Sequence, residues 1–256
     1  MLIASGVPAI VSILVAFVAG CLAGTVTGLL HTLFGIPAIL SGILSQLILY
    51  SVNLRILSGK SMVSLVGSTD SVLLSMSNNP LAILVACLII ALLIVVLWLF
   101  FYTEVGLTLK STGDNPNMSR AQGVNVNFNK VLGLAISNGI VALSGALLAQ
   151  YKGSANINDG RGAIVIGLAA IFIGLSVSLK IKPNFVVSLI GVVGGSIIYY
   201  IIYTVVVLMG INTQYLKMLS AIIVVLFLAI PYVKSEYFPK HKAPAPISEE
   251  GGDGNA

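Results

Sequence analysis

The chain has 256 residues, of which 57% are hydrophobic and only 8% are charged, and its formal net charge is +5. Soluble domains carry about 25% charged residues, so a chain this poor in charge cannot cover a water-exposed surface and must be solvated by lipid. The basic residues are scattered rather than clustered beside aromatic side chains, so the charge is not a nucleic-acid-binding signal. We find no nucleophile–base pair, no phosphate-binding glycine loop and no cluster with metal-ligand spacing, and we expect no catalysis by this chain and no cofactor within it.

The first charged residue is Arg55, and the stretch before it is long enough for two membrane-spanning helices of about 20 residues each. Gly35 and Pro37 interrupt that stretch, so we expect spans at about 8–30 and 36–54. The first span also has a glycine at every fourth position, which makes a small-residue stripe on which another helix can pack closely. These glycines are Gly20, Gly24 and Gly28.

A polar link at 55–79 leads to the third expected span, which Pro80 opens and which runs to about residue 101. Aromatic residues cluster at the far end of this span, as is typical of a belt at the membrane–water boundary. They are Trp98, Phe100, Phe101 and Tyr102.

The polar stretch 103–130 lies between two charge-free stretches and carries signals for a short helix of its own. Asn115 can cap this helix, Pro116 suits its first turn, and Gly123 can end it in a left-handed conformation. The helix would present Met118, Arg120, Ala121 and Gln122. We interpret it as a docking element for a cytoplasmic partner; the alternative is an ordinary solvated loop.

The rest of the chain adds a fourth span at 131–150, a short polar link at 151–161 and further apolar stretches. The stretch 162–179 is barely long enough to cross, so it is either a tilted span or a broken pair of half-helices. A sixth span is expected at 184–208, and a seventh ends at Pro231. The fold class is therefore an all-α polytopic membrane protein of about seven spans, with a membrane domain at 1–234 and a disordered cytoplasmic tail at 235–256.

Three spans carry polar side chains on one face, and such faces are costly in lipid unless they look inward or at water. The candidates for a translocation path are Gln46, Tyr50 and Asn53 in the second span, Asn138 in the fourth, and Ser196, Tyr199 and Tyr203 in the sixth. For each residue taken singly, helix–helix hydrogen bonding and packing is the alternative.

No expected span carries an Asp or Glu, which disfavours a proton- or sodium-coupled transporter, because such transporters commonly use intramembrane carboxylates. Two alternatives stay open from the residues alone. One is a self-contained secondary transporter or channel for a small uncharged solute, and the other is a membrane scaffold subunit without a path.

Alternation of seven spans places 103–130 and the tail on one side of the membrane, with 8 of the 13 Lys and Arg residues, against 5 on the other. The positive-inside rule then makes the side of 103–130 cytoplasmic. The N-terminus would lie outside, although no signal sequence precedes it.

Four stretches resemble the membrane permease subunits of ABC importers of the branched-chain amino acid and ribose type. They are 49–59 (LYSVNLRILSG), 113–126 (GDNPNMSRAQGVNV), 136–153 (ISNGIVALSGALLAQYKG) and 216–231 (LKMLSAIIVVLFLAIP). The first stretch is similar to a subgroup of permeases for tryptophan or other amino acids. Members of this family usually begin with a further span, so the resemblance leads us to expect either that the start of this sequence is truncated or that this member lacks one helix.

The resemblance implies a permease in the bacterial inner membrane that imports a small solute. The similar subgroup makes us expect an amino acid, with a preference for aromatic ones. It implies a homodimer of permeases in the lipid bilayer, an ABC ATP-binding subunit that holds ATP and Mg²⁺, and an extracytoplasmic substrate-binding protein. The residues 115–123 would correspond to the helix that docks on the ATP-binding subunit.

Overall fold

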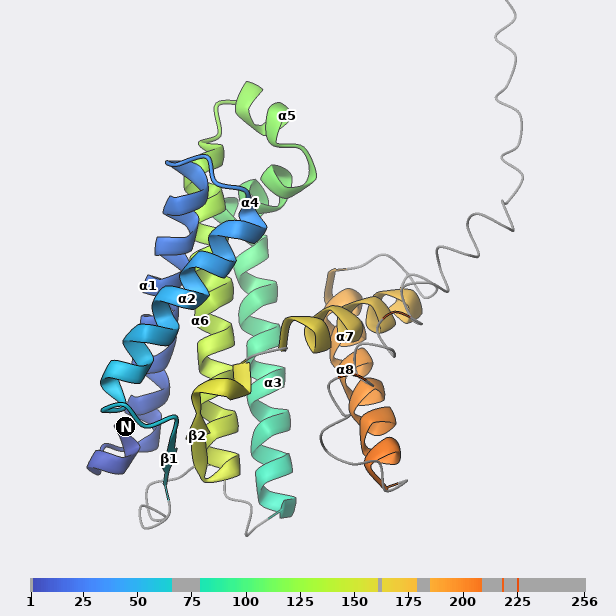
Figure 1. Ribbon diagram of the computed structural model, residues 1–256. Coiled ribbons are helices and arrows are strands. Elements are labelled where there is room, and N and C mark those ends of the chain that lie inside the picture. Colours follow the sequence, from blue (N-terminus) through green and yellow to red (C-terminus); the bar gives the residue numbers. More distant parts are fainter. Residues whose placement is uncertain are drawn as a thin grey trace, which may run out of the picture. The chain divides into compact units, whose positions relative to one another are not determined.

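The computed structural model describes residues 2–65, 79–160, 163–178 and 185–208, with Met218 and Val225, and these residues are mostly helical (Figure 1). The chain divides into two compact units, Met1–Arg161 and Gly162–Ala256. The first unit contains η1 (Ile3–Ser5), α1 (Ala9–Thr32), α2 (Ala38–Ile56), β1 (Met62–Ser64), α3 (Asn79–Tyr102), α4 (Glu104–Asp114), α5 (Pro116–Ala121), α6 (Val126–Lys152), β2 (Ser154–Asn156) and η3 (Ile157–Gly160). The second contains α7 (Ala163–Ser178) and α8 (Phe185–Leu208).

Five helices among the described residues are long and apolar enough to cross a membrane, which confirms the all-α polytopic class. They are α1, α2, α3, α6 and α8. Apart from Met218 and Val225, the seventh expected span lies outside the described residues, as does the whole tail at 235–256.

The glycine stripe of α1 packs closely on α6, as its spacing predicted. A Cβ at Gly20 would lie 2.5 Å from Ala142 Cβ, and a Cβ at Gly28 would lie 2.8 Å from Val131 Cα. At Gly24, between them, a Cβ would overlap the backbone of Leu134. The backbones of α1 and α6 approach this closely because glycine has no side chain to hold them apart, which is how small residues hold helices together in lipid.

Helices α1 and α2 are joined by a buried hydrogen bond inside the apolar region. The Thr27 and Ser45 hydroxyl oxygens lie 2.8 Å apart, and because Thr27 can give its only proton to the Ala23 carbonyl at 3.0 Å, it can accept from Ser45. At the turn between the two helices, His31 Nδ1 lies 2.8 Å from the carbonyl oxygen of Ile36, and Gly35 takes a φ of 67°. The break expected at Gly35 and Pro37 is therefore a short turn that side-chain contacts hold in place.

Helix α3 is the most apolar of the spans, and none of the residues in its most apolar part is buried in this chain. It ends in a sharp turn at Thr103, whose Oγ1 accepts a hydrogen bond from the Gly106 backbone N–H at 3.2 Å. A Cβ at Gly106 would lie 2.6 Å from Phe101 Cα, so only glycine lets α4 turn back so closely on the end of α3.

The two polar links that were expected on the non-cytoplasmic side pair with each other, which the sequence did not indicate. Strands β1 and β2 are antiparallel, with Val63 opposite Ala155 at the centre of the register. This small sheet ties the end of α2 to the end of α6 at the opposite end of the first unit from α5 (Figure 1). An exposed ion pair, Lys152 with Asp159 at 3.2 Å, lies at the same end.

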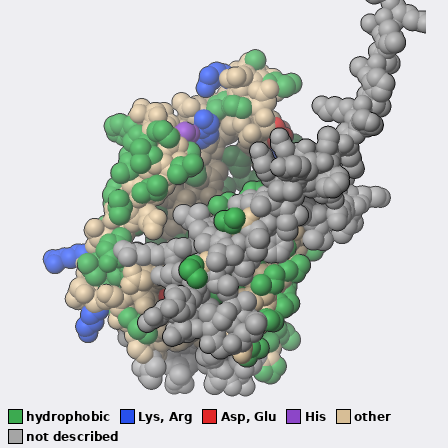
Figure 2. All heavy atoms as spheres, turned by 45° about the vertical axis from the view of Figure 1, so that its right-hand side comes forward, with side chains coloured by type: hydrophobic (Ala, Val, Ile, Leu, Met, Phe, Trp, Pro, Cys, Tyr) green, Lys and Arg blue, Asp and Glu red, His purple; other side chains and the backbone are tan. Residues whose placement is uncertain are grey.

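The described basic side chains of the first unit also lie toward its two ends. In the face that Figure 2 shows, basic side chains lie at the top and at the lower left, and apolar side chains are among those between them. Of the first unit's described basic residues, Arg55 and Lys152 lie in the last turns of α2 and α6, and Lys60 follows α2, all at the β1–β2 end. The opposite end carries Lys110, Arg120 and Lys130.

In the second unit, α7 and α8 pack through another set of glycines. A Cβ at Gly174 would lie 2.8 Å from Val192 Cα, and a Cβ at Gly195 would lie 2.8 Å from Gly174 Cα. Helix α7 is continuous over Ala163–Ser178, so the prediction of broken half-helices is wrong for these residues. These residues include no proline, which is a common cause of a break or kink in a helix.

Candidate functional site

The stretch 103–130 is more regular than the sequence suggested. Instead of one short helix in a loop, it contains α4, α5 and the first turn of α6, which begins at Val126 rather than near residue 131. The sequence signal for α4 was its N-cap, Thr103, followed by Glu104 in the first turn. Threonine caps a helix by accepting from a backbone N–H, and an acidic residue suits the positive end of the helix dipole.

Both ends of α5 are capped as predicted. The Asn115 side chain accepts hydrogen bonds from the backbone N–H groups of Asn117 and Met118, each at 3.1 Å, and Pro116 occupies the first turn. At the other end Gly123 has a φ of 82°. Its N–H donates to the Arg120 carbonyl at 3.0 Å, and the next N–H donates to the Ser119 carbonyl at 3.1 Å. This pair of bonds is the Schellman motif, which needs a left-handed residue at this position.

The inner side of α5 is fixed by buried polar contacts that the sequence analysis missed. Ser119 is 1% exposed, and its hydroxyl donates to Ser111 Oγ in α4 at 3.2 Å. At the next residue of α4, Asn129 Nδ2 donates to Thr112 Oγ1 at 3.0 Å and so joins α6 to α4. In a polar stretch, serine, threonine and asparagine are expected to be solvated. The sequence alone does not show that these three-dimensional neighbours pair with one another and hold the helices together.

The outer side of α5 is open. Of the residues predicted to dock, Met118 is 60% exposed, and Asn115, Pro116, Arg120, Ala121, Gln122 and Gly123 are exposed as well. Gln122 is the C-cap residue rather than part of the helix. A shallow depression of about 200 Å³ lies beside them, and it is lined by Arg120, Val124, Asn125, Val126 and Asn127. The structure thus brings the whole predicted set into one exposed, rigidly held surface.

Two of the path candidates in α2 are exposed on this single chain. Gln46 and Asn53 are exposed and Tyr50 is half-buried, whereas Ser41 and Ser45 are buried. Gln46 follows Ser45 directly, which places it about 100° further around the helix. The polar side chains of α2 therefore form two stripes, one held against α1 and one left open.

Asn138 lies where α6 packs closely against α1. Its backbone carbonyl oxygen would lie 2.6 Å from a Cβ at Gly20. The side-chain Nδ2 donates to the Leu134 carbonyl of its own helix at 2.9 Å. This residue is half-buried, and its amide group finds a partner within α6.

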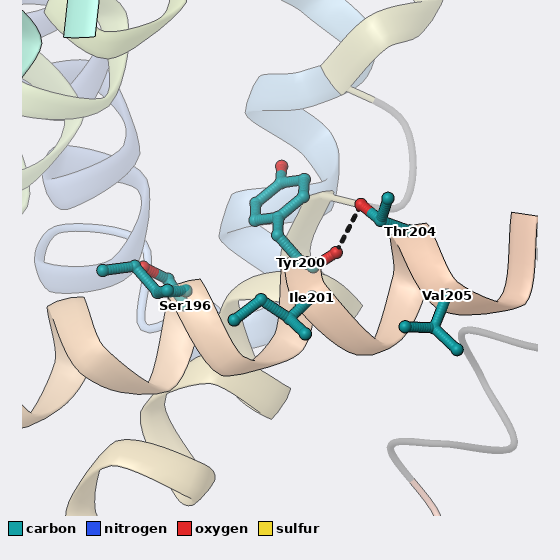
Figure 3. A pocket seen from close by; sticks show the side chains of 6 residues that line it. Ser196, Tyr200, Ile201, Thr204 and Val205 are labelled. Carbon is teal, nitrogen blue, oxygen red and sulfur yellow. Dashed lines mark hydrogen bonds between the residues drawn. The ribbon is translucent and has the colours of Figure 1, made fainter. Parts of the chain in front are cut away.

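The sixth expected span divides its polar residues between two faces of α8. Tyr199 is fully buried in a cluster with Ala169 and Ile173 of α7, and Tyr203 packs against that cluster. Ser196 instead lines a groove of about 410 Å³ on the other side, together with Ile197, Tyr200, Ile201, Thr204 and Val205 (Figure 3).

The groove on α8 adds Tyr200 and Thr204 to the candidates. With Ser196 they form a row of hydroxyl groups at every fourth residue, which was the signal available in the sequence. Ser196 Oγ donates to the Val193 carbonyl at 2.7 Å, and Thr204 Oγ1 donates to the Tyr200 carbonyl at 2.8 Å. Both hydroxyl groups thus have their protons in use and offer acceptor lone pairs to whatever occupies the groove.

Comparison with known proteins decides the family. A family model described as the permease component of branched-chain amino acid transport systems matches residues 1–228. The chain belongs to this family of ABC-type permeases. It is a multi-pass protein of the bacterial inner membrane and a transporter rather than an enzyme.

Two curated relatives match the permease over most of its length. A tyrosine transport system permease protein of Clostridioides difficile is 39% identical over 88% of this chain and 74% of its own length. An uncharacterised protein of Rickettsia prowazekii is 31% identical over 88% of this chain and 79% of its own length. An autoinducer 2 import system permease protein of an Enterobacter species is 30% identical over 64% of this chain and 47% of its own length. No solved structure matches the permease.

Proposed function

We propose that this permease forms the membrane path of an ATP-driven importer for an amino acid, with aromatic amino acids preferred. The similarity to the tyrosine transport permease, 39% identity over 225 residues, supports this substrate class. The groove on α8 agrees with it, because its described lining residues are aromatic, aliphatic or hydroxyl-bearing and none of them is charged.

An ABC ATP-binding subunit docks on the outer surface of α5 and holds the ATP and Mg²⁺. The observation that carries this proposal is that α5 is capped at both ends, buried on one side by Ser119 and open on the other at Met118 and Arg120. A helix that is capped and packed in this way can transmit a displacement of a bound partner to the rest of the chain. Its exposed methionine and arginine are residue types enriched at protein interfaces.

The path runs between two copies of the permease, and an extracytoplasmic substrate-binding protein delivers the solute at the end that carries β1 and β2. Gln46 and Asn53 are exposed on one copy, and polar side chains at membrane depth need water or a partner. A second copy that encloses an aqueous path against these residues meets that need.

The deciding experiment is copurification followed by reconstitution. The permease is expressed with a candidate ATP-binding subunit and a candidate binding protein from the same organism, purified in mild detergent and placed in proteoliposomes. We expect the ATP-binding subunit to copurify, and tyrosine, tryptophan or phenylalanine uptake to require ATP and to exceed leucine uptake. Uptake by the permease alone without ATP would overturn the proposal in favour of a self-contained transporter or channel. Leucine uptake that exceeds aromatic uptake would overturn the substrate class only.

A further inference from the structure

The contact between α4 and the first turns of α6 has a feature that docking on α5 does not require. Helix α5 is not joined directly to α6 by a long interface; α4 stands between them. Ser119 of α5 bonds Ser111 of α4, and Thr112 of α4 bonds Asn129 of α6. Both ends of the second bond are buried, because Thr112 is 6% and Asn129 is 4% exposed.

The bond between Thr112 and Asn129 has a fixed direction. Thr112 Oγ1 donates its only proton to the Thr108 carbonyl at 2.7 Å, so toward Asn129 it acts as an acceptor. Asn129 must therefore point its amide nitrogen at Thr112, as it does at 3.0 Å. A directional bond of this kind holds one relative position of α4 and α6.

The neighbouring contact lacks this property. One turn further along, Leu109 of α4 lies over Gly133 of α6, where a Cβ would be 3.1 Å from Leu109 Cδ1. Apolar contact is not directional, so Leu109 can slide along the surface of α6 without losing its burial. Among the described contacts, Thr112–Asn129 is the one that sets the register of α4 on α6.

Beyond Asn129, α6 continues directly into its close packing with α1. The glycines of α1 meet the backbone of α6 from Val131 onward, only two residues after Asn129. Close-packed backbones cannot shift separately without overlap. A displacement that reaches the first turn of α6 in register therefore moves α1 as well.

We propose that Asn129, through Thr112, is a positioning residue that locks α4 and α5 to α6, so that the ATP-driven displacement of α5 reaches α6 and α1 as the motion of one rigid body. This inference rests on the proposed docking of an ATP-binding subunit on α5. It predicts that the lock stays closed through the transport cycle, and that loss of the lock uncouples ATP hydrolysis from uptake without preventing docking.

The test uses the complete importer in proteoliposomes and measures solute taken up per ATP hydrolysed. Thr112→Val and Asn129→Leu each remove the bond with little change of volume. We expect each to lower uptake per ATP by about three- to tenfold, with the ATP-binding subunit still copurifying at wild-type yield. The double variant should be no worse than the poorer single variant, since the two residues act through one bond. Thr112→Ser keeps the hydroxyl acceptor and should show the uptake per ATP of the wild type. Thr108→Val removes a hydroxyl group one turn away and should leave uptake per ATP unchanged.

A second measurement does not depend on whether these variants fold well. In a background where Cys21 and Cys87 are replaced by alanine, Thr112→Cys and Asn129→Cys are joined by a short thiol cross-linker after assembly. We expect the cross-linked importer to retain coupled uptake. Loss of uptake on cross-linking would mean that α4 and α6 slide during the cycle and would overturn the proposal. Normal uptake per ATP in Thr112→Val or additive effects in the double variant would overturn it too. Absence of copurification or ATP-dependent uptake in the wild type would instead refute the proposed function.

Discussion

Helix α6 is held in two different ways along its length, and the contrast shows how the surroundings decide what a helix contact can be made of. In its apolar part it meets α1 through glycines, and backbone lies on backbone at Gly24 and Leu134. In its first turn it meets α4 through the hydrogen bond from Asn129 to Thr112. In lipid there is little hydrophobic gain from bringing apolar helices together, so close van der Waals packing is the main attraction. At the aqueous end, a buried polar pair adds direction.

The largest effect is expected from a substitution in the glycine contact between α1 and α6. We expect Gly24→Leu to destabilise the permease by about 3 kcal/mol or more, because the new side chain needs the space that the backbone of Leu134 and Ala135 occupies. Gly145→Leu on α6 is the matched control, since a Cβ at Gly145 meets nothing within 4 Å. Thermal unfolding in detergent measures both. Equal melting temperatures for the two variants would show that α1 and α6 do not need their close approach.

The cap of α5 gives the next largest effect. Valine at position 123 must adopt a φ near 82°, which is strained for a β-branched residue, and we expect a cost of about 1–2 kcal/mol. Membrane levels should stay normal, whereas recovery of the ATP-binding subunit and uptake should fall. Gly113→Val is the control, because Gly113 in α4 is exposed and has open space around it. If Gly123→Val transports like the wild type, the end of α5 does not position the docking surface.

The bond between α1 and α2 tests how much a polar contact contributes inside the apolar region. Thr27→Val removes the bond to Ser45, and we expect a loss of only about 0.6 kcal/mol, the average for such bonds in membrane proteins. Thr25→Val on the same helix removes only a hydroxyl group that donates to the Cys21 carbonyl of α1 itself. Chemical denaturation of both variants gives the difference. A loss of several kcal/mol at Thr27 alone would mean that polar bonds, not glycine packing, hold the first unit together.

Arg120→Glu should leave stability unchanged to within about 0.5 kcal/mol, because the side chain is exposed, yet it should strongly reduce uptake per ATP. The reason is that it reverses the charge that the surface of α5 offers to a partner. Lys110→Glu makes the same charge change on exposed α4 and serves as the control. Uptake at the wild-type rate in Arg120→Glu would identify Arg120 as a solvated bystander.

The local parts of the fold and of the candidate site could be predicted because their causes are local. Runs of apolar residues fixed the spans, and Asn115, Pro116 and Gly123 placed both ends of α5, since each acts on the backbone within a few residues of itself. The helix α4 was missed for a related reason. Its sequence contains two glycines and several threonines and serines, which have low helix propensity, and its stability comes from packing against α3 and α6.

The sequence by itself determined that this protein lives in lipid, that its spans are helical, and that a capped helix begins at Pro116. Only the tertiary structure decided that Asn129 meets Thr112, that β1 pairs with β2, and that Tyr200 lines a groove while Tyr199 is buried against α7. The first two and the burial of Tyr199 depend on contacts between residues far apart in the chain. A lone polar side chain has the same local preferences whether it is solvated, paired or facing a path, so its role is fixed only by what the fold places beside it.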